Sequence, residues 1–223
     1  MVFRELKTQA KAALRQHFGA KMLLMIIPIL IEVFGVANNN SHTLRGQSQG
    51  ITFDIAYFVS LLIGLIVAYF VIILVVAGAF NYLQIFRGKL TNPKFSNLFV
   101  PFRDGSAGKI FMLVFIQAII TVVLLFIPII GWIFLIYLGL GWSQSIYVLY
   151  DQIENGTYRG TMNVLRTSSN LMKGYRGNYF LFHLSFILWY ILIWITFGLA
   201  AFWVIPYIQM SSVAYYEELT ENS

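Results

Sequence analysis

The chain has 223 residues, of which 59% are hydrophobic and 11% are charged, and its formal net charge is +6. Soluble domains carry about 25% charged residues, so this composition excludes a water-soluble globular protein. The lack of cysteine in the sequence excludes disulfides, thiolate metal sites and thiol catalysis. We therefore expect an all-α, polytopic integral membrane protein, whose positive charge sets its orientation and does not indicate a nucleic-acid partner.

The polar segment at residues 1–19 is the first predicted element. Apolar side chains recur at helical spacing on one face: Phe3, Leu6, Ala10, Ala13 and His17. Basic side chains recur on another face: Arg4, Lys7, Lys11 and Arg15. This pattern is typical of an amphipathic helix that lies at the level of the lipid headgroups.

Four long apolar runs follow, and a helix needs about 20 apolar residues to cross a bilayer. The last two runs are too long for one crossing, and each contains a turn signal, FIPIIGW in one and ITFG in the other. We therefore expect six transmembrane helices, at residues 20–37, 53–80, 110–127, 131–150, 179–195 and 198–216. Four spans with two re-entrant hairpins are the alternative.

The predicted spans divide a single membrane domain, residues 1–223, into alternating segments. These are the N-terminal helix (1–19), spans one and two (20–80), a cytoplasmic segment (81–109), spans three and four (110–150), a cytoplasmic amphipathic segment (151–178), spans five and six (179–216) and a tail (217–223). All the Lys and Arg residues except Arg45 lie in the N-terminal arm or in the two cytoplasmic segments. The positive-inside rule then places both termini in the cytoplasm.

Three segments share a pattern of a polar stretch, a basic residue near glycine and an apolar run: LRQHFGAKMLL, PFRDGSAGKIFML and LMKGYRGNYFLF. They predict three copies of an amphipathic helix followed by a helical hairpin, although independent juxtamembrane signals would give the same pattern. We expect the following basic residues to face lipid headgroups: Arg4, Lys11, Arg15, Arg159, Arg166, Lys173 and Arg176. In the alternative interpretation, these charges only fix the orientation of the chain.

Five polar residues within the predicted spans are the candidate functional residues: Glu32, Gln117, Gln144, His183 and Gln209. Glu32 falls near the middle of the first span, or at the outer interface if that helix is short. The other four lie in the cytoplasmic half or near the middle of the bilayer. They predict either a polar vestibule open to the cytoplasm or hydrogen bonds between helices.

No catalytic, phosphate-binding or metal-binding motif occurs in the sequence, and its three histidines lie in different segments. We therefore expect a protein that is not an enzyme and that uses no cofactor and no metal.

The sequence resembles the DUF975 family of bacterial integral membrane proteins, most strongly from Leu165 to Leu219. The resemblance is carried by LMKGYRGNYFLFHLSFILW, ITFG and WVIPYIQMSSVAYYEEL, and it extends to LKTQAKAAL and FIPIIGWIFLIYLGLGWSQSIYVLYDQ. That family has no established activity and is distantly similar to the membrane domain attached to some glycerophosphodiester phosphodiesterases. The resemblance implies a six-helix fold in the bacterial cytoplasmic membrane, with structural roles for Lys173, Gly174, Arg176, Pro206 and Tyr207.

Two functions fit these observations. The first is a membrane scaffold or accessory protein that docks anionic lipid or a protein partner on its cytoplasmic face, with a homo-oligomer as one form of that partner. The alternative is a transporter or channel for a small or lipophilic solute, which would use the polar residues of the spans.

Overall fold

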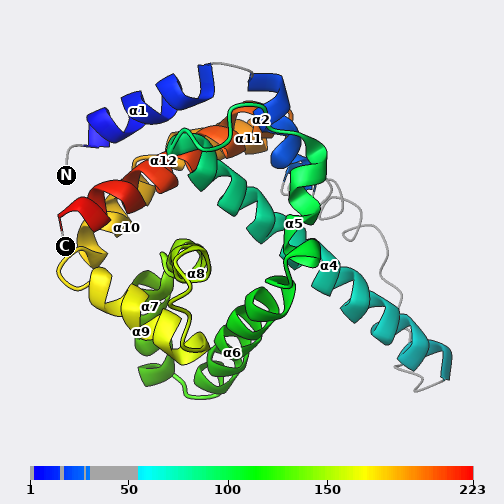
Figure 1. Ribbon diagram of the computed structural model, residues 1–223. Helices are drawn as coiled ribbons and strands as arrows, with labels where there is room; N and C mark the ends of the chain where they lie inside the picture. The colour runs from blue at the N-terminus through cyan, green and yellow to red at the C-terminus, as the bar shows by residue number, and fades with distance from the viewer. Residues whose placement is uncertain (1–2, 16–17, 28, 31–54, 223) are drawn as a thin grey trace.

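The computed structural model describes residues 3–15, 18–27, 29–30 and 55–222, and within them every regular element is helical, as the composition predicts (Figure 1). The elements are α1 (Phe3–Arg15), α2 (Phe18–Leu24), α4 (Ile55–Phe86), the 3-10 helix η1 (Phe95–Phe99), α5 (Val100–Arg103), α6 (Ala107–Leu125), α7 (Ile130–Trp142), α8 (Ser145–Glu154), α9 (Thr161–Leu171), α10 (Arg176–Leu184), α11 (Ile187–Ile195) and α12 (Ala201–Glu221).

Four helical segments of the described chain are long and apolar enough to cross a membrane. They are Leu62–Phe86 in α4, Ala107–Leu125 in α6, Ile130–Glu154 in α7 and α8, and Arg176–Ile195 in α10 and α11. These segments correspond to the second to fifth expected spans. The sixth expected span is helical but is not among the four, because α12 carries glutamine, serine and glutamate in its C-terminal half. The first expected span, residues 20–37, lies largely outside the described residues.

Large apolar side chains cover the outer surface of these four segments. Leu65 of α4, Val123 of α6, Ile136 of α7 and Leu188 of α11 are each more than half exposed. A water-soluble protein does not tolerate so much exposed apolar surface, whereas lipid covers it without cost. The structure therefore fits a membrane location.

Two tight turns join α6 to α7 and α11 to α12 at the positions that FIPIIGW and ITFG predict. Ile129 (φ 65°) and Phe197 (φ 51°) have left-handed backbone conformations that side chains rarely adopt. In the first turn the chain also approaches itself closely, since a Cβ atom on Gly131 would lie 2.0 Å from the carbonyl oxygen of Leu124. Glycine is therefore required at position 131.

The expected spans at 131–150 and 179–195 are each present as one membrane-crossing segment, but each contains a short interruption of its helix. One break lies between α7 and α8, and the other lies between α10 and α11. At the first break the Ser143 hydroxyl donates to the carbonyl of Leu140 (2.8 Å), and at the second Ser185 donates to Phe182 (2.5 Å). Serine side chains that bond to the preceding helical turn in this way bend helices.

The centre of the fold is α12, and 13 of its 21 residues are buried. Helix α1 lies along it, with the start of α1 close to the C-terminal end of α12 (Figure 1). Leu6 and Ala10 of α1 are fully buried, so protein covers the apolar face of this amphipathic helix, while its basic residues Arg4, Lys11 and Arg15 stay exposed. In the same way, α9 packs on α7 and α8, and η1 packs on α4.

Candidate functional site

A cavity of about 310 Å³ lies between α4, the α7–α8 break, α10 and α12. Its apolar lining comes mainly from α4 and α12, including Val76 and Ile208. Its polar lining consists of Ser143, Tyr147, Tyr179, His183, Tyr190, Gln209 and Ser212. The cavity thus places hydrogen-bonding groups from several helices around one space inside the apolar segments.

Some hydrogen-bonding capacity in this region is used and some is free. Gln209 Nε2 donates to the Tyr147 hydroxyl (2.8 Å), which joins α12 to α8. His183 Nε2, on the cavity wall, and Gln144 Oε1, in the adjacent helix break, are buried and have no hydrogen-bond partner among the described residues. Buried polar atoms are nearly always hydrogen-bonded, so the free His183 Nε2 marks the cavity as a place where a polar molecule or group can bind.

The α7–α8 break borders the cavity through Ser143, and each of the two helix breaks receives a hydrogen bond from a surface helix. The Ser168 hydroxyl of α9 donates to the carbonyl of Gly141 at the end of α7 (2.8 Å). Lys7 Nζ of α1 donates to the hydroxyl (2.7 Å) and the carbonyl (3.3 Å) of Ser185. Burial, together with the neighbouring charge of Lys11, lowers the pKa of Lys7. The surface helices therefore complete the hydrogen bonding of the interrupted spans.

A charged network joins the ends of three helices. Arg87, which follows α4, forms two hydrogen bonds to Asp151 of α8 (2.5 and 3.0 Å) and an ion pair with Glu217 of α12 (2.8 Å). The Tyr216 hydroxyl also donates to Asp151 (2.6 Å). Burial alone would lower the pKa of Arg87, but the hydrogen bonds and charges of Asp151 and Glu217 raise it. Arg87 therefore stays charged and holds the three helix ends together.

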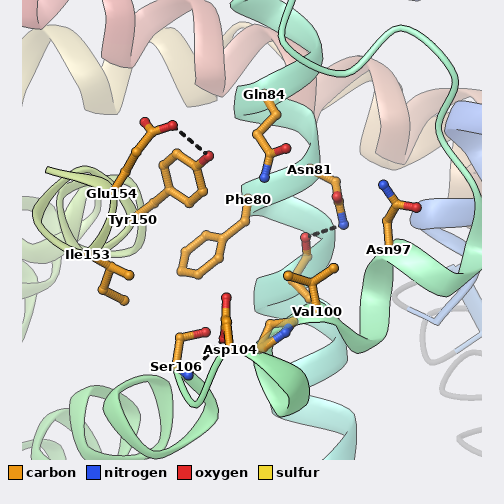
Figure 2. Close-up of a pocket in the computed structure, with 12 residues that line it drawn as sticks. Phe80, Asn81, Gln84, Asn97, Val100, Asp104, Ser106, Tyr150, Ile153 and Glu154 are labelled. Carbon is orange, nitrogen blue, oxygen red and sulfur yellow. Dashed lines mark hydrogen bonds between the residues drawn. The ribbon is translucent and has the colours of Figure 1, made fainter. Parts of the chain in front are cut away.

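A second pocket, of about 190 Å³, lies beside this network between α4, η1–α5 and α8 (Figure 2). Gln84 projects from α4, and Asn97 lies across the pocket from Phe80 and Tyr150 (Figure 2). Asp104 accepts a hydrogen bond from the backbone of Ser106 (2.9 Å), and Tyr150 donates to Glu154 (3.4 Å). The charge of Glu154 is offset by Lys89 (2.7 Å), so Asp104 supplies the remaining negative charge of this pocket.

The profile of the family described as "Protein of unknown function (DUF975)" matches residues 105–223. This chain belongs to the DUF975 family. The family match includes α6 to α12 and therefore the cavity walls formed by the α7–α8 break, α10 and α12, whereas α2 and α4 lie before it. No curated protein matches the chain, and no solved structure matches it either.

Two of the five polar candidates meet at the cavity of this DUF975 chain. His183 and Gln209 line it, and Gln144 lies in the break beside it. Gln117 instead donates to the Ser145 hydroxyl (3.0 Å), which joins α6 to α8 and matches the interhelical bond that was one of the two interpretations. Glu32 lies outside the described residues.

The predicted headgroup residues are mostly solvent-facing. Six of the seven side chains are exposed: Arg4, Lys11, Arg15, Arg159, Arg166 and Lys173. Arg176 differs, since its guanidinium lies 3.7 Å from the centre of the Tyr137 ring and donates to the Ser169 hydroxyl (2.7 Å). Arg176 therefore packs α10 against α7 and α9.

Neither the Arg87 network nor the pocket of Figure 2 is evident from the sequence. Arg87 and Asp151 are 64 positions apart, and both look like ordinary charges at the end of a span. The pocket likewise combines groups from distant segments. Only the arrangement of the helices brings these groups together.

Proposed function

We propose that this protein is a non-enzymatic protein of the bacterial cytoplasmic membrane, with both termini in the cytoplasm, that docks anionic lipid with its cytoplasmic face. One observation carries the proposal. Among the basic side chains of the described residues, only Arg87 and Lys89 form ion pairs with carboxylates. Asp151, Glu154 and Glu217 are already paired with Arg87 or Lys89. The exposed Lys and Arg side chains nearby are therefore left without a carboxylate in the described part of the chain and can bind an external anion.

Anionic lipid is the partner that this charge suits best. Anionic headgroups of the inner leaflet attract basic residues by about 1 kcal/mol each near the surface. Arg159, Arg166 and Lys173 are exposed around α9, and Arg4 is exposed on α1. A protein partner, including a second copy of the chain, would have to present an acidic surface to replace the lipid.

The proposal includes six spans arranged as three copies of a surface element followed by a helical hairpin. The packing order supports it, because each surface element covers the last helix of the preceding copy. Thus η1 packs on α4, α9 packs on α7 and α8, and α1 packs on α12. Because α1 of the first copy packs on α12, the last helix of the third copy, the three copies form a closed ring.

Native mass spectrometry of the full chain tests lipid docking. The protein is extracted from membranes that contain equal amounts of phosphatidylglycerol and phosphatidylcholine, and the retained lipids are counted. We expect phosphatidylglycerol to be enriched, and replacement of Arg159 and Arg166 by glutamine to reduce that enrichment. Equal retention of the two lipids by the unaltered chain would exclude the proposal.

The two helix breaks favour a second candidate function, a transporter or channel for a small or lipophilic solute. Interrupted helices whose breaks border a cavity are typical of solute sites in transporters. Here the α7–α8 break borders the cavity that His183 and Gln209 line, and the interrupted α10–α11 segment supplies His183 and Tyr190 to its wall. Light scattering of proteoliposomes exposed to glycerol tests this candidate with a neutral probe. We expect faster glycerol entry than in protein-free liposomes and its loss in Gln209→Leu. Equal rates with and without protein would count against it.

A further inference from the structure

A groove of about 360 Å³ lies between the C-terminal half of α1, the start of α2 and the neighbouring parts of α11 and α12. Its lining residues are Lys11, Leu14, Arg15, Phe18, Trp189, Trp203 and Tyr207. Leucine and aromatic rings make up most of this surface, and the two cations of α1 provide its charge. The groove thus combines an apolar lining with a positive group, which is the chemistry of an anionic amphiphile site.

The two cations have no acidic partner in the described part of the chain. Lys11 and Arg15 are both exposed, and neither forms an ion pair with a carboxylate there. Lys11 Nζ lies 5.6 Å from the centre of the Tyr207 ring, which keeps the ammonium group at the edge of the groove. An anionic group that enters the groove therefore meets two positive charges that no carboxylate offsets.

The apolar lining is continuous with the surface that faces lipid. Trp203 is 63% exposed and Trp189 is 38% exposed, and the neighbouring Leu188 of α11 is more exposed still. Tryptophan is enriched where hydrocarbon meets headgroups, because its ring is apolar while its N–H needs a polar partner. This continuity favours an occupant from the bilayer over a soluble peptide.

We propose that the groove is a discrete site for one anionic phospholipid, with its phosphate between Lys11 and Arg15 and an acyl chain against Trp189 and Trp203. The proposal goes beyond the proposed function, since the groove lies along the N-terminal half of α12, toward the α11–α12 turn and away from the Arg87 network at the other end of this helix. A zwitterionic lipid carries a cation beside its phosphate, so the two basic side chains select against it. A fatty acid lacks the glycerol and the second acyl chain that keep a phospholipid anchored in the bilayer beside the groove.

Fluorescence quenching by brominated lipids tests the site directly. The chain has five tryptophans, and replacing Trp132, Trp142 and Trp194 by phenylalanine leaves the two that line the groove. The full chain is reconstituted in phosphatidylcholine with increasing fractions of brominated phosphatidylglycerol, brominated phosphatidylcholine or brominated fatty acid. We expect brominated phosphatidylglycerol to quench at the lowest fraction. Replacing both Lys11 and Arg15 by glutamine should weaken that preference about 30-fold.

A matched variant separates the groove from a diffuse effect of charge. Replacing Arg159 and Arg166 by glutamine removes the same charge from exposed positions outside the groove, and we expect it to leave the quenching unchanged. Equal losses in the two double variants would overturn the discrete site and leave docking by the charged face intact.

Three other results would also overturn the discrete site. Equal quenching by the two brominated phospholipids would mean that the groove contacts bilayer lipid without selectivity. This result would exclude the discrete site even if mass spectrometry still finds phosphatidylglycerol enriched on the protein. Preferential quenching by the fatty acid would replace the phospholipid as the occupant. Protection of both tryptophans from every lipid, together with cross-linking of two chains through Trp203→Cys, would assign the groove to a second copy of the chain.

Discussion

The guanidinium of Arg87 is paired through two hydrogen bonds with the carboxylate of Asp151, at 2.5 and 3.0 Å. The same guanidinium reaches Glu217, so α4, α8 and α12 meet at a single side chain. Because these helices come from three distant parts of the sequence, the contact defines the arrangement of the bundle at this end.

Arg87→Met should lower the free energy of unfolding by about 1–3 kcal/mol, because it leaves the half-buried carboxylates of Asp151 and Glu217 facing each other without a cation. Thermal unfolding in detergent micelles measures the change. Arg87→Lys keeps the charge but loses the two parallel hydrogen bonds to Asp151, so its free energy of unfolding should lie between those of the unaltered chain and Arg87→Met. Lys89→Gln is the matched control, since Lys89 is half exposed and its pair contributes little. Equal effects at positions 87 and 89 would contradict the role of Arg87.

Gly131→Ala should lower the free energy of unfolding by about 2 kcal/mol or more, because the new Cβ would clash with the carbonyl oxygen of Leu124 at 2.0 Å. Gly139→Ala lies in the same helix and meets nothing within 4 Å. It should be neutral or stabilise the protein by up to about 1 kcal/mol, since alanine favours helix. Denaturation in micelles compares the two variants, and a harmless alanine at position 131 would argue against the tight α6–α7 turn.

Ser168→Ala should cost about 1–2 kcal/mol, because the buried carbonyl of Gly141 loses its donor at the α7–α8 break. The neighbouring Asn170 is exposed and makes no such bond, so Asn170→Ala should change stability by less than about 0.5 kcal/mol. Unfolding temperatures of the two variants give the comparison. If Ser168→Ala matched its control, α9 would not contribute to the hydrogen bonding of the break.

The bond between Gln209 and Tyr147 should be measurable in a double-mutant cycle of Gln209→Leu and Tyr147→Phe. Hydrogen bonds between membrane helices average about 0.6 kcal/mol, so a coupling of that size is expected from the 2.8 Å contact. The free energy of unfolding in detergent is measured for the unaltered chain, the two single variants and the double variant. Additive effects of the two substitutions would show that the side chains of Gln209 and Tyr147 are not hydrogen-bonded, which would contradict the polar contact in the cavity wall.

Much of the fold could be predicted from hydropathy and turn chemistry. Apolar runs separated by FIPIIGW and ITFG predicted the second to fifth spans, and the structure places both turns there. Polar side chains are costly inside apolar helices and must find one another or a cavity. That reasoning selected His183 and Gln209, which line one cavity, and Gln144, which is buried in the neighbouring α7–α8 break.

The helix breaks, by contrast, could not be predicted from hydropathy. They depend on hydrogen bonds of Ser143 and Ser185 to their own helical turn, and serine makes the same bonds in continuous helices. The packing of α1 along α12 was also beyond the sequence, because an amphipathic helix buries its apolar face equally well in lipid or in protein. The structure places Leu6 and Ala10 in protein.

Cysteine labelling in intact cells tests the central claim, that the basic surface faces the cytoplasm, most directly. The sequence has no cysteine, so single cysteines report without background: Thr91→Cys beside the basic segment, Asn222→Cys in the tail and Leu199→Cys in the α11–α12 turn. A membrane-impermeant maleimide should label only Leu199→Cys in intact cells and should label the other two after the cells are opened. Labelling of Asn222→Cys or Thr91→Cys in intact cells would contradict the orientation and the lipid docking that depends on it.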